Sequence, residues 1–231
     1  MIQKIHAAER HQGDHGWLKT HWLFSFGNYY DPTNMGFGVL RVFNDDIVMP
    51  HSGFPDHPHD TMEIVTIILS GVLTHTDSIG NEATITAGQI QRMSAGAGIV
   101  HSEFNKHDEP VHLYQLWFHP NTTTQADYEE MDITPSTEGP LTLLASPEGG
   151  EGLTLRADAR IWQYTLDGSA IWNMSPDAGW GHLVYVTEGS LTINGETFQE
   201  GDQARITDET TLVYAGTQGK GVIIEVRTTT P

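Results

Sequence analysis

The chain has 231 residues and a formal net charge of -19, from 30 acidic and 11 basic side chains. This charge repels phosphate backbones and anionic lipid head groups, which argues against direct binding to nucleic acid or a membrane surface. Cysteine is absent, which excludes disulfides, thiolate metal sites and a cysteine nucleophile. We find no signal-peptide core and no stretch near the roughly 20 apolar residues of a membrane helix, so we expect a cytoplasmic protein.

Short β-rich runs recur along the chain, and helical periodicity is almost absent. In chain order they are Gly38–Phe43, Glu63–Leu69, Val72–His75, Val111–Phe118, His182–Val186, Leu191–Ile193 and Gly221–Val226. Turn residues stand between them, and Asn194-Gly195 is a strong hairpin signal because both residues of that turn take positive φ. The pattern predicts an all-β fold of sandwich or barrel type.

A weak internal repeat divides the chain. The segments EIVTIILSGVLTHTDSIGNEATITAGQIQRMSAG and HLVYVTEGSLTINGETFQEGDQARI follow the same order of strands and glycines, so that Gly71 matches Gly189 and Gly88 matches Gly201. A long segment poor in apolar residues, 121–152, lies between them. We therefore expect two antiparallel β-barrels of jelly-roll type. Residues 1–130 would form the first with an N-terminal arm, and residues 131–231 the connection and the second.

Two pairs of side chains in the first half have the spacing of metal ligands. His57 and His59 are two residues apart, as are His101 and Glu103. In a strand, residues at i and i+2 point to the same face. Two neighbouring strands carrying these pairs would surround one ion with three imidazoles and one carboxylate. Each pair alone is more often solvated than bound to metal, and the combination is the stronger signal.

This ligand set has a chemical meaning. Nitrogen and oxygen donors without thiolate suit a divalent transition metal: Fe(II) is our first expectation, with Mn, Co, Ni, Cu and Zn also accepted. Three neutral ligands and one anion leave about one positive charge on the site, and an octahedral ion would keep two positions open. The second half lacks such pairs, because His182 stands alone there. We expect it to bind no metal.

The segments HPHDTMEIVTIILSGVLTHTDSIGN and MSAGAGIVHSEFN, preceded by GWLKTHWLFSFGNYYDPTNMGFGVLRVFNDD, resemble the pirin family of the cupin superfamily. The resemblance is dense from Gly16 to Pro120 and looser beyond. It implies a bicupin fold and assigns His57, His59, His101 and Glu103 as the ligands of the metal.

The resemblance also implies an activity. Some bacterial pirin-like proteins are quercetin 2,3-dioxygenases, which cleave a flavonol with O2 and release carbon monoxide. Mapped here, the ion would lower the pKa of the flavonol 3-hydroxyl, and Glu103 would accept its proton. The alternative implied by other pirins is a metal-binding regulator that acts through a protein partner without turnover. A third reading is a different cupin reaction, such as an isomerisation.

Several residues remain open at this point. Glu63 either points inward behind the ligands or has a structural role, and His51 is expected to be a solvated loop histidine. His112 alternates with Tyr114, which favours a hydrogen-bonded core histidine over a catalytic one. Phe54 is the best candidate for a pocket wall against a flat substrate.

Overall fold

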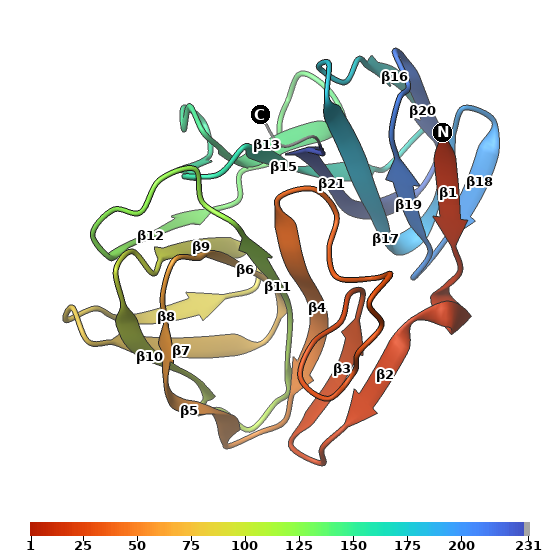
Figure 1. Ribbon diagram of the computed structural model, residues 1–231. Helices are drawn as coiled ribbons and strands as arrows, with labels where there is room; N and C mark the ends of the chain where they lie inside the picture. Colours follow the sequence, from red (N-terminus) through yellow and green to blue (C-terminus); the bar gives the residue numbers. More distant parts are fainter. Residues whose placement is uncertain (229–231) are drawn as a thin grey trace.

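The computed structural model describes residues 1–228 (Figure 1). Its strands form three mostly antiparallel sheets, which make up two units. A seven-stranded sheet has the order β12-β9-β6-β11-β4-β3-β2 and belongs to the first unit. Its members are β2 (His11–Asp14), β3 (Leu18–Trp22), β4 (Leu40–Val48), β6 (Glu63–Ser70), β9 (Gln89–Ser94), β11 (Val111–Phe118) and β12 (Asp127–Asp132).

A four-stranded sheet faces it and completes the first unit. Its order is β5-β10-β7-β8, with β5 (Ser52–His59), β7 (Val72–Asp77), β8 (Glu82–Thr86) and β10 (Ile99–Asn105). Within the described residues no ladder joins these two sheets, so the predicted barrel is an open jelly roll rather than a closed cylinder. Strand β5 lies at the sheet edge, which suits Pro55 and Pro58 because proline has no N–H for a second ladder.

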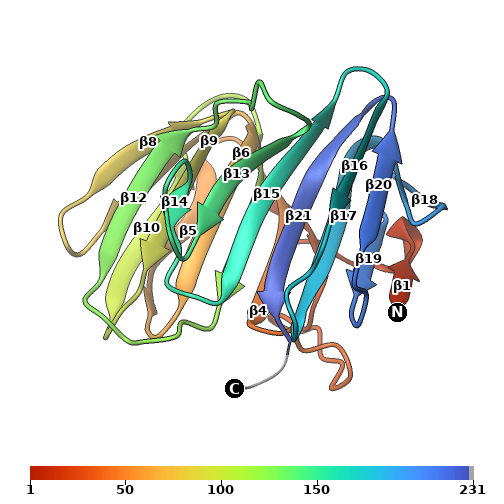
Figure 2. The same cartoon turned by 90° about the horizontal axis from the view of Figure 1, so that it is seen from above.

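The second unit is a ten-stranded sheet that folds over on itself, with β1-β19-β17-β21-β15-β13-β14 as its main path. Three further strands lie off that path: β18 and β20 pair with β17, and β16 pairs with β20. Its members are β1 (Ile2–Ile5), β13 (Leu141–Ser146), β14 (Leu153–Thr154), β15 (Ala159–Leu166), β16 (Ala170–Met174), β17 (Trp180–Ile193), β18 (Glu196–Gln199), β19 (Gln203–Ile206), β20 (Leu212–Gly216) and β21 (Gly219–Arg227). The two units stand side by side in Figure 2.

The N-terminal arm corrects one expectation. We placed it with the first barrel, whereas β1 pairs with β19 of the second unit through the register Ile2↔Ile206 to Ile5↔Gln203. A short 3-10 turn, η1 (Ala7–Glu9), then leads the chain back to β2 in the first unit. The division at residues 130 and 131 stays a prediction. No helix within residues 1–228 is long and apolar enough to cross a membrane.

The internal repeat is confirmed at its glycines. Gly71 and Gly189 both have positive φ, 81° and 69°. A Cβ at Gly71 would lie 2.5 Å from the Pro110 carbonyl oxygen, and one at Gly189 would lie 2.5 Å from that of Gln218. The same close approach of backbones therefore recurs in both units, and only glycine fits it.

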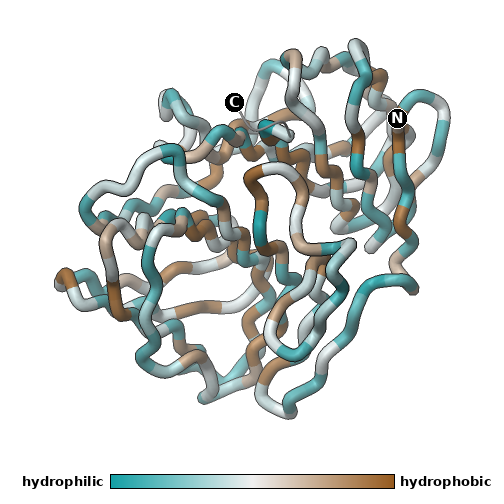
Figure 3. The backbone as a smooth tube through the Cα atoms, in the orientation of Figure 1, coloured by the Kyte–Doolittle hydropathy of each residue, from teal (hydrophilic) through white to brown (hydrophobic). Residues whose placement is uncertain are grey.

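The apolar core joins the units. One buried cluster contains residues from both, including Phe43, Tyr114 and Phe118 of the first and Tyr185 and Ile224 of the second. The rings of Phe43, Tyr114 and Tyr185 lie 5.1–5.5 Å apart in edge-on or tilted pairs; such pairs contribute about 0.5–1.5 kcal/mol each beyond burial. Figure 3 shows many of the hydrophobic residues along the strands and many of the hydrophilic ones in the loops.

Thr61 supports a prediction about backbone strain. It is exposed, links β5 to β6 and has φ 49°, which is costly for a β-branched residue. We expect Thr61→Gly to raise the free energy of unfolding by about 1 kcal/mol, measured by urea denaturation. Thr84→Gly, in the extended strand β8, is the control and should lower it. Equal effects of the two changes would contradict this view of Thr61.

Candidate metal centre

The predicted ligand pairs lie on neighbouring strands. Strands β5 and β10 are antiparallel partners, and His101 is directly opposite His57 in their register. Between His101 and Glu103 the register shifts, because Glu103 is opposite Phe54 and two residues of β5 stand between Phe54 and His57. This bulge at Pro55 and Asp56 bends the edge strand at the ligands.

Three imidazoles converge where the sequence predicts. One nitrogen from each of His57, His59 and His101 lies within 4.8 Å of the others. Their ring centroids are 4.4–5.0 Å apart. His101 is buried at 1% exposure, while His57 and His59 are half-buried. The three rings therefore face one point that opens toward solvent on the β5 side.

Two of these rings are held in the neutral form that metal binding requires. Burial and the neighbouring imidazoles lower the pKa of His59 to about 4 and that of His101 to about 3. His57 Nδ1 lies 2.8 Å from the Pro55 carbonyl oxygen. Since that oxygen only accepts, Nδ1 carries the proton and Nε2 is left with its lone pair.

Glu103 is buried at 1% exposure and is held by amide donors. Gln91 Nε2 donates to its Oε1 at 2.7 Å, and Gln115 Nε2 donates to its Oε2 at 2.6 Å. The Thr66 hydroxyl is 3.3 Å from Oε1. Three donors leave about one acceptor position on the carboxylate, which has roughly four.

An aromatic donor holds the Gln115 amide in the orientation that serves Glu103, because Trp117 Nε1 donates to Gln115 Oε1 at 3.1 Å. The Gln115 NH2 group therefore faces the carboxylate. The Tyr128 hydroxyl lies 3.1 Å from Gln91 Oε1 and donates to the nearer Glu130 Oε2 at 2.7 Å. Sequence analysis missed these two glutamines, because their roles depend on which strands face each other.

His75 is the other residue that sequence analysis missed at this site. A second group of potential ligands contains His75, His101 and Glu103, and all three are buried. Glu103 belongs to this group rather than to the group of His57 and His59. The sequence shows only that His75 and Asp77 are two residues apart, whereas the approach of His75 to Glu103 depends on the pairing of β7 with β10.

Two features of these residues fit a metal ion. His101 Nε2 is buried without a hydrogen-bond partner, which is costly unless a further group satisfies it. The available donors are imidazole nitrogens and a carboxylate that other groups already orient, as in metal sites. The residues therefore fit a divalent transition metal held by His57, His59 and His101. We keep Glu103 as the predicted fourth ligand.

The other residues left open by the sequence have structural positions. Glu63 is buried but points away from the centre, and its Oε2 accepts from the Arg156 backbone N–H at 3.1 Å. His112 Nε2 lies 2.6 Å from Asp45 Oδ1 and is half-buried. His51 is exposed and pairs with Asp108 at 2.9 Å. Phe54 packs edge-on against Trp17 at 5.0 Å and lies 6.3 Å from the His57 ring.

Within residues 1–228, both groups of potential metal ligands lie in the first unit. In the second unit His182 is fully buried, with Nδ1 2.9 Å from the Tyr214 hydroxyl. Its Nε2 lies 3.3 Å from a Glu225 oxygen but forms no hydrogen bond, so this nitrogen is unpartnered as His101 Nε2 is. That environment is a pair of polar contacts inside an aromatic core rather than a converging ligand set.

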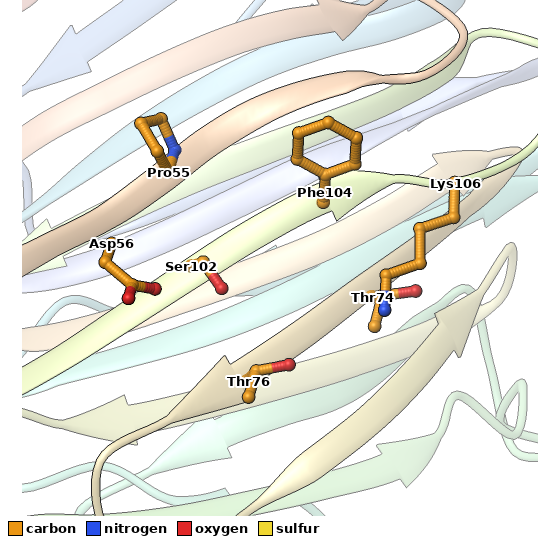
Figure 4. Close-up of a pocket in the computed structure, with 7 residues that line it drawn as sticks. All are labelled: Pro55, Asp56, Thr74, Thr76, Ser102, Phe104 and Lys106. Atoms are coloured by element: carbon orange, nitrogen blue, oxygen red, sulfur yellow. The ribbon is translucent and has the colours of Figure 1, made fainter.

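A hollow of about 490 Å³ lies on the outer face of the same small sheet (Figure 4). Its lining includes Asp56, Ser102 and Phe104, which alternate with the ligands along β5 and β10. Because alternate residues of a strand point to opposite faces, this hollow lies behind the metal centre and does not open into it.

Asp46 provides a test of the polar interior of this unit. It is 1% exposed, and burial, with Asp45 and Glu103 nearby, raises its pKa to about 7 although the Thr20 hydroxyl donates to it. Between about pH 4 and pH 7 the folded chain keeps this proton and the unfolded chain does not, so stability falls as the pH rises.

We therefore expect Asp46→Asn to stabilise the metal-free protein at pH 8 by a few kcal/mol and to leave it nearly unchanged at pH 4, since one pKa unit corresponds to about 1.4 kcal/mol. Urea unfolding at pH 4, 6 and 8 measures this. Asp108→Asn, on the surface, is the control. A variant that follows the wild-type pH profile would show that Asp46 is charged when folded.

The fold and the site together define a class: a two-unit cupin with a histidine-rich centre in its first unit. A family model described as Pirin matches residues 5–118, and one described as Quercetinase C-terminal cupin domain matches residues 143–226. The chain belongs to the pirin family.

Individual relatives are similar to this chain over nearly its whole length. Quercetin 2,3-dioxygenase of Escherichia coli K12 is 36% identical over 232 residues, covering 98% of this chain and 99% of its own. A pirin-like protein of Caulobacter vibrioides is 37% identical, covering 91% and 93%. The crystal structure of the bacterial pirin YhhW from Escherichia coli in complex with nickel(II) superposes with a TM-score of 0.94 at 35% identity, covering 99% and 100%.

Proposed function

We propose that this chain is a metal-dependent dioxygenase that cleaves flavonols such as quercetin with O2. The observation that carries the proposal is the convergence of three imidazoles, one with a buried unpartnered nitrogen, beside an oriented carboxylate. The relative named quercetin 2,3-dioxygenase, which aligns over nearly the whole chain, supports the choice of reaction.

The metal would be one divalent transition ion, with Fe(II) as our first assignment and Ni(II) supported by the complex of the YhhW relative. When bound, the ion supplies Lewis acidity that makes the flavonol 3-hydroxyl more acidic. His57, His59 and His101 would hold it, and the half-buried His57 and His59 place the site near the solvent side of β5. In the reaction O2 adds across the central ring, and the products are a depside and carbon monoxide.

The chain's own residues bind and orient the substrate. Phe54 and Trp117 are partly buried and lie beside His57 and His59, with the Trp117 ring 4.6 Å from the His59 ring. Two aromatic side chains flanking the histidines suit a flat aromatic substrate. They also exclude water from the reacting ring.

Glu103 is the group that we assign to proton transfer. Its carboxylate keeps about one free acceptor position after the donors from Gln91, Gln115 and Thr66 are counted. A positioned carboxylate within hydrogen-bond reach can accept the hydroxyl proton of the substrate. The same position would serve as the fourth ligand in the resting protein.

Turnover of quercetin tests the proposal. Purified protein loaded with Fe(II), Mn(II), Co(II), Ni(II) or Cu(II) is mixed with quercetin and O2, and flavonol absorbance and carbon monoxide are followed together. We expect turnover that falls at least about 100-fold in Glu103→Gln, the low end for a general base. Glu63→Gln, a buried carboxylate that points away from the centre, is the matched control and should stay active.

The absence of turnover with every metal at full occupancy would reject the flavonol reaction. It would favour the alternative of a metal-binding regulator that acts through a protein partner. Turnover that persists in Glu103→Gln would reject only the proton-transfer role of that residue.

A further inference from the structure

Two buried residues beside the metal centre, His75 and Asp77, have no role in the function proposed above. His75 is fully buried on β7, and its Nε2 lies 3.1 Å from Asp77 Oδ2, with both side chains at 0% exposure. On the other side, His75 Nδ1 lies 3.5 Å from His101 Nδ1. The three side chains thus form a line that ends at a ligand.

Asp77 is fixed as an acceptor at the far end of this line. The backbone N–H groups of Ile79 and Asn81 donate to its Oδ1 at 3.1 and 3.0 Å. The Asn81 side-chain amide donates to Oδ2 at 2.9 Å. A carboxylate that receives three donors of this kind is stabilised in its charged form, and in that form it only accepts.

The tautomers follow from this acceptor one ring at a time. Because Asp77 only accepts, His75 Nε2 carries the ring proton in this arrangement, which leaves His75 Nδ1 as the acceptor toward His101. The facing His101 Nδ1 must donate, so it carries the proton of that ring. His101 Nε2 is left bare, and it is one of the buried side-chain atoms without a hydrogen-bond partner. Tyr128 stacks on His75 at 4.7 Å and 22°, which restrains its rotation.

We propose that His75 and Asp77 are positioning residues that present the Nε2 lone pair of His101 to the metal. The inference rests on the metal site proposed above. Partners behind a ligating histidine fix its tautomer and increase its basicity, and their loss typically lowers metal affinity by about 10–100-fold. We expect that range here, together with a shift of the Fe(III)/Fe(II) potential to higher values when the carboxylate is removed.

The first measurement needs no metal. Long-range nitrogen–proton NMR of the metal-free protein reports which nitrogen of each histidine is protonated. We expect His101 with a protonated Nδ1 and a bare Nε2, and a second tautomer in Asp77→Asn. Asp108→Asn, which removes the same type of partner from the exposed His51, is the matched control and should leave His101 unchanged.

The second measurement is Ni(II) affinity by calorimetry. Asp77→Asn should weaken binding by about 10–100-fold, whereas Asp108→Asn should not. His75→Gln keeps an acceptor toward His101 and should lose less affinity than His75→Leu, which provides a test if Asp77→Asn folds poorly.

Three results would overturn the inference. One is a wild-type His101 whose Nε2 is protonated, and another is an Asp77→Asn protein with unchanged tautomer and affinity. The third is Ni(II) binding that survives His57→Ala but not His75→Leu, which would place the ion on His75. If the wild type fails to bind Ni(II), the proposed metal site is wrong, and the tautomers still decide the role of Asp77.

Discussion

Replacing His101 with alanine should lower the affinity for Ni(II) or Fe(II) by more than about 100-fold, the upper range for loss of an outer partner alone. His101 is the residue shared by both groups of potential ligands. Its Nε2 is buried and has no other partner, so an ion is the group that best satisfies it. Competition with a chelator, under anaerobic conditions for Fe(II), measures the loss.

The matched control for this change is His182→Gln. His182 is equally buried but lies in the second unit, where its nitrogens face Tyr214 and Glu225. We expect this variant to bind the ion as the wild type does. A His101→Ala protein that is folded by circular dichroism and binds the metal within about twofold of the wild type would contradict the site.

Replacing Asp45 with alanine should destabilise the whole protein by about 3 kcal/mol or more. Asp45 lies on β4, and its Oδ2 accepts a hydrogen bond from the Tyr185 hydroxyl of the second unit at 2.7 Å. The same oxygen lies 3.4 Å from Arg10 Nη1. The side chains of Asp45 and Arg10 are only 12% and 11% exposed. Without the carboxylate, the guanidinium is left buried without its counter-charge, and the contact between the units is lost.

Thermal unfolding measures this loss. A change of 3 kcal/mol should lower Tm by about 6–12 °C in a chain of this size. Asp177→Ala is the control, because its contact with Arg160 at 3.2 Å involves side chains that are 62% and 27% exposed. Such pairs contribute about 0–1 kcal/mol. Similar shifts in the two variants would show that the Asp45 contacts do not join the units.

The fold class and the imidazole cluster could be predicted because both depend on the two-residue alternation of side chains along short strands. Alternation in strands places His57 with His59 and His101 with Glu103, and the structure pairs their strands with His101 opposite His57. Positive φ was predicted for Asn194 and Gly195 from the requirement of a two-residue turn, and their values are 47° and 85°. These features follow from short stretches of sequence.

The direction of Glu63 shows where local period fails. Counting by twos from His57 and His59 allows Glu63 to face inward, but Thr61, with φ 49°, interrupts the strand between them. The alternation begins again in β6, where Thr66 faces Glu103 and Glu63 faces Arg156. Alternation therefore predicts a common face only within one uninterrupted strand.

Partners that are distant in the sequence were beyond prediction for a different reason. Strand β1 is only four residues long, and its sequence does not indicate that β19 is its partner. The roles of His75, Gln91 and Gln115 likewise depend on which strands lie opposite each other. Such roles require the three-dimensional register.

The most direct test of the metal centre is anomalous diffraction from crystals of the protein loaded with Ni(II) or Fe(II). We predict one strong peak in the first unit, within about 2.0–2.3 Å of nitrogens from His57, His59 and His101 and of an oxygen from Glu103. Asp77 should remain hydrogen-bonded to His75. A peak on His75 without His57 and His59, or no peak in the first unit of a loaded crystal, would contradict the account.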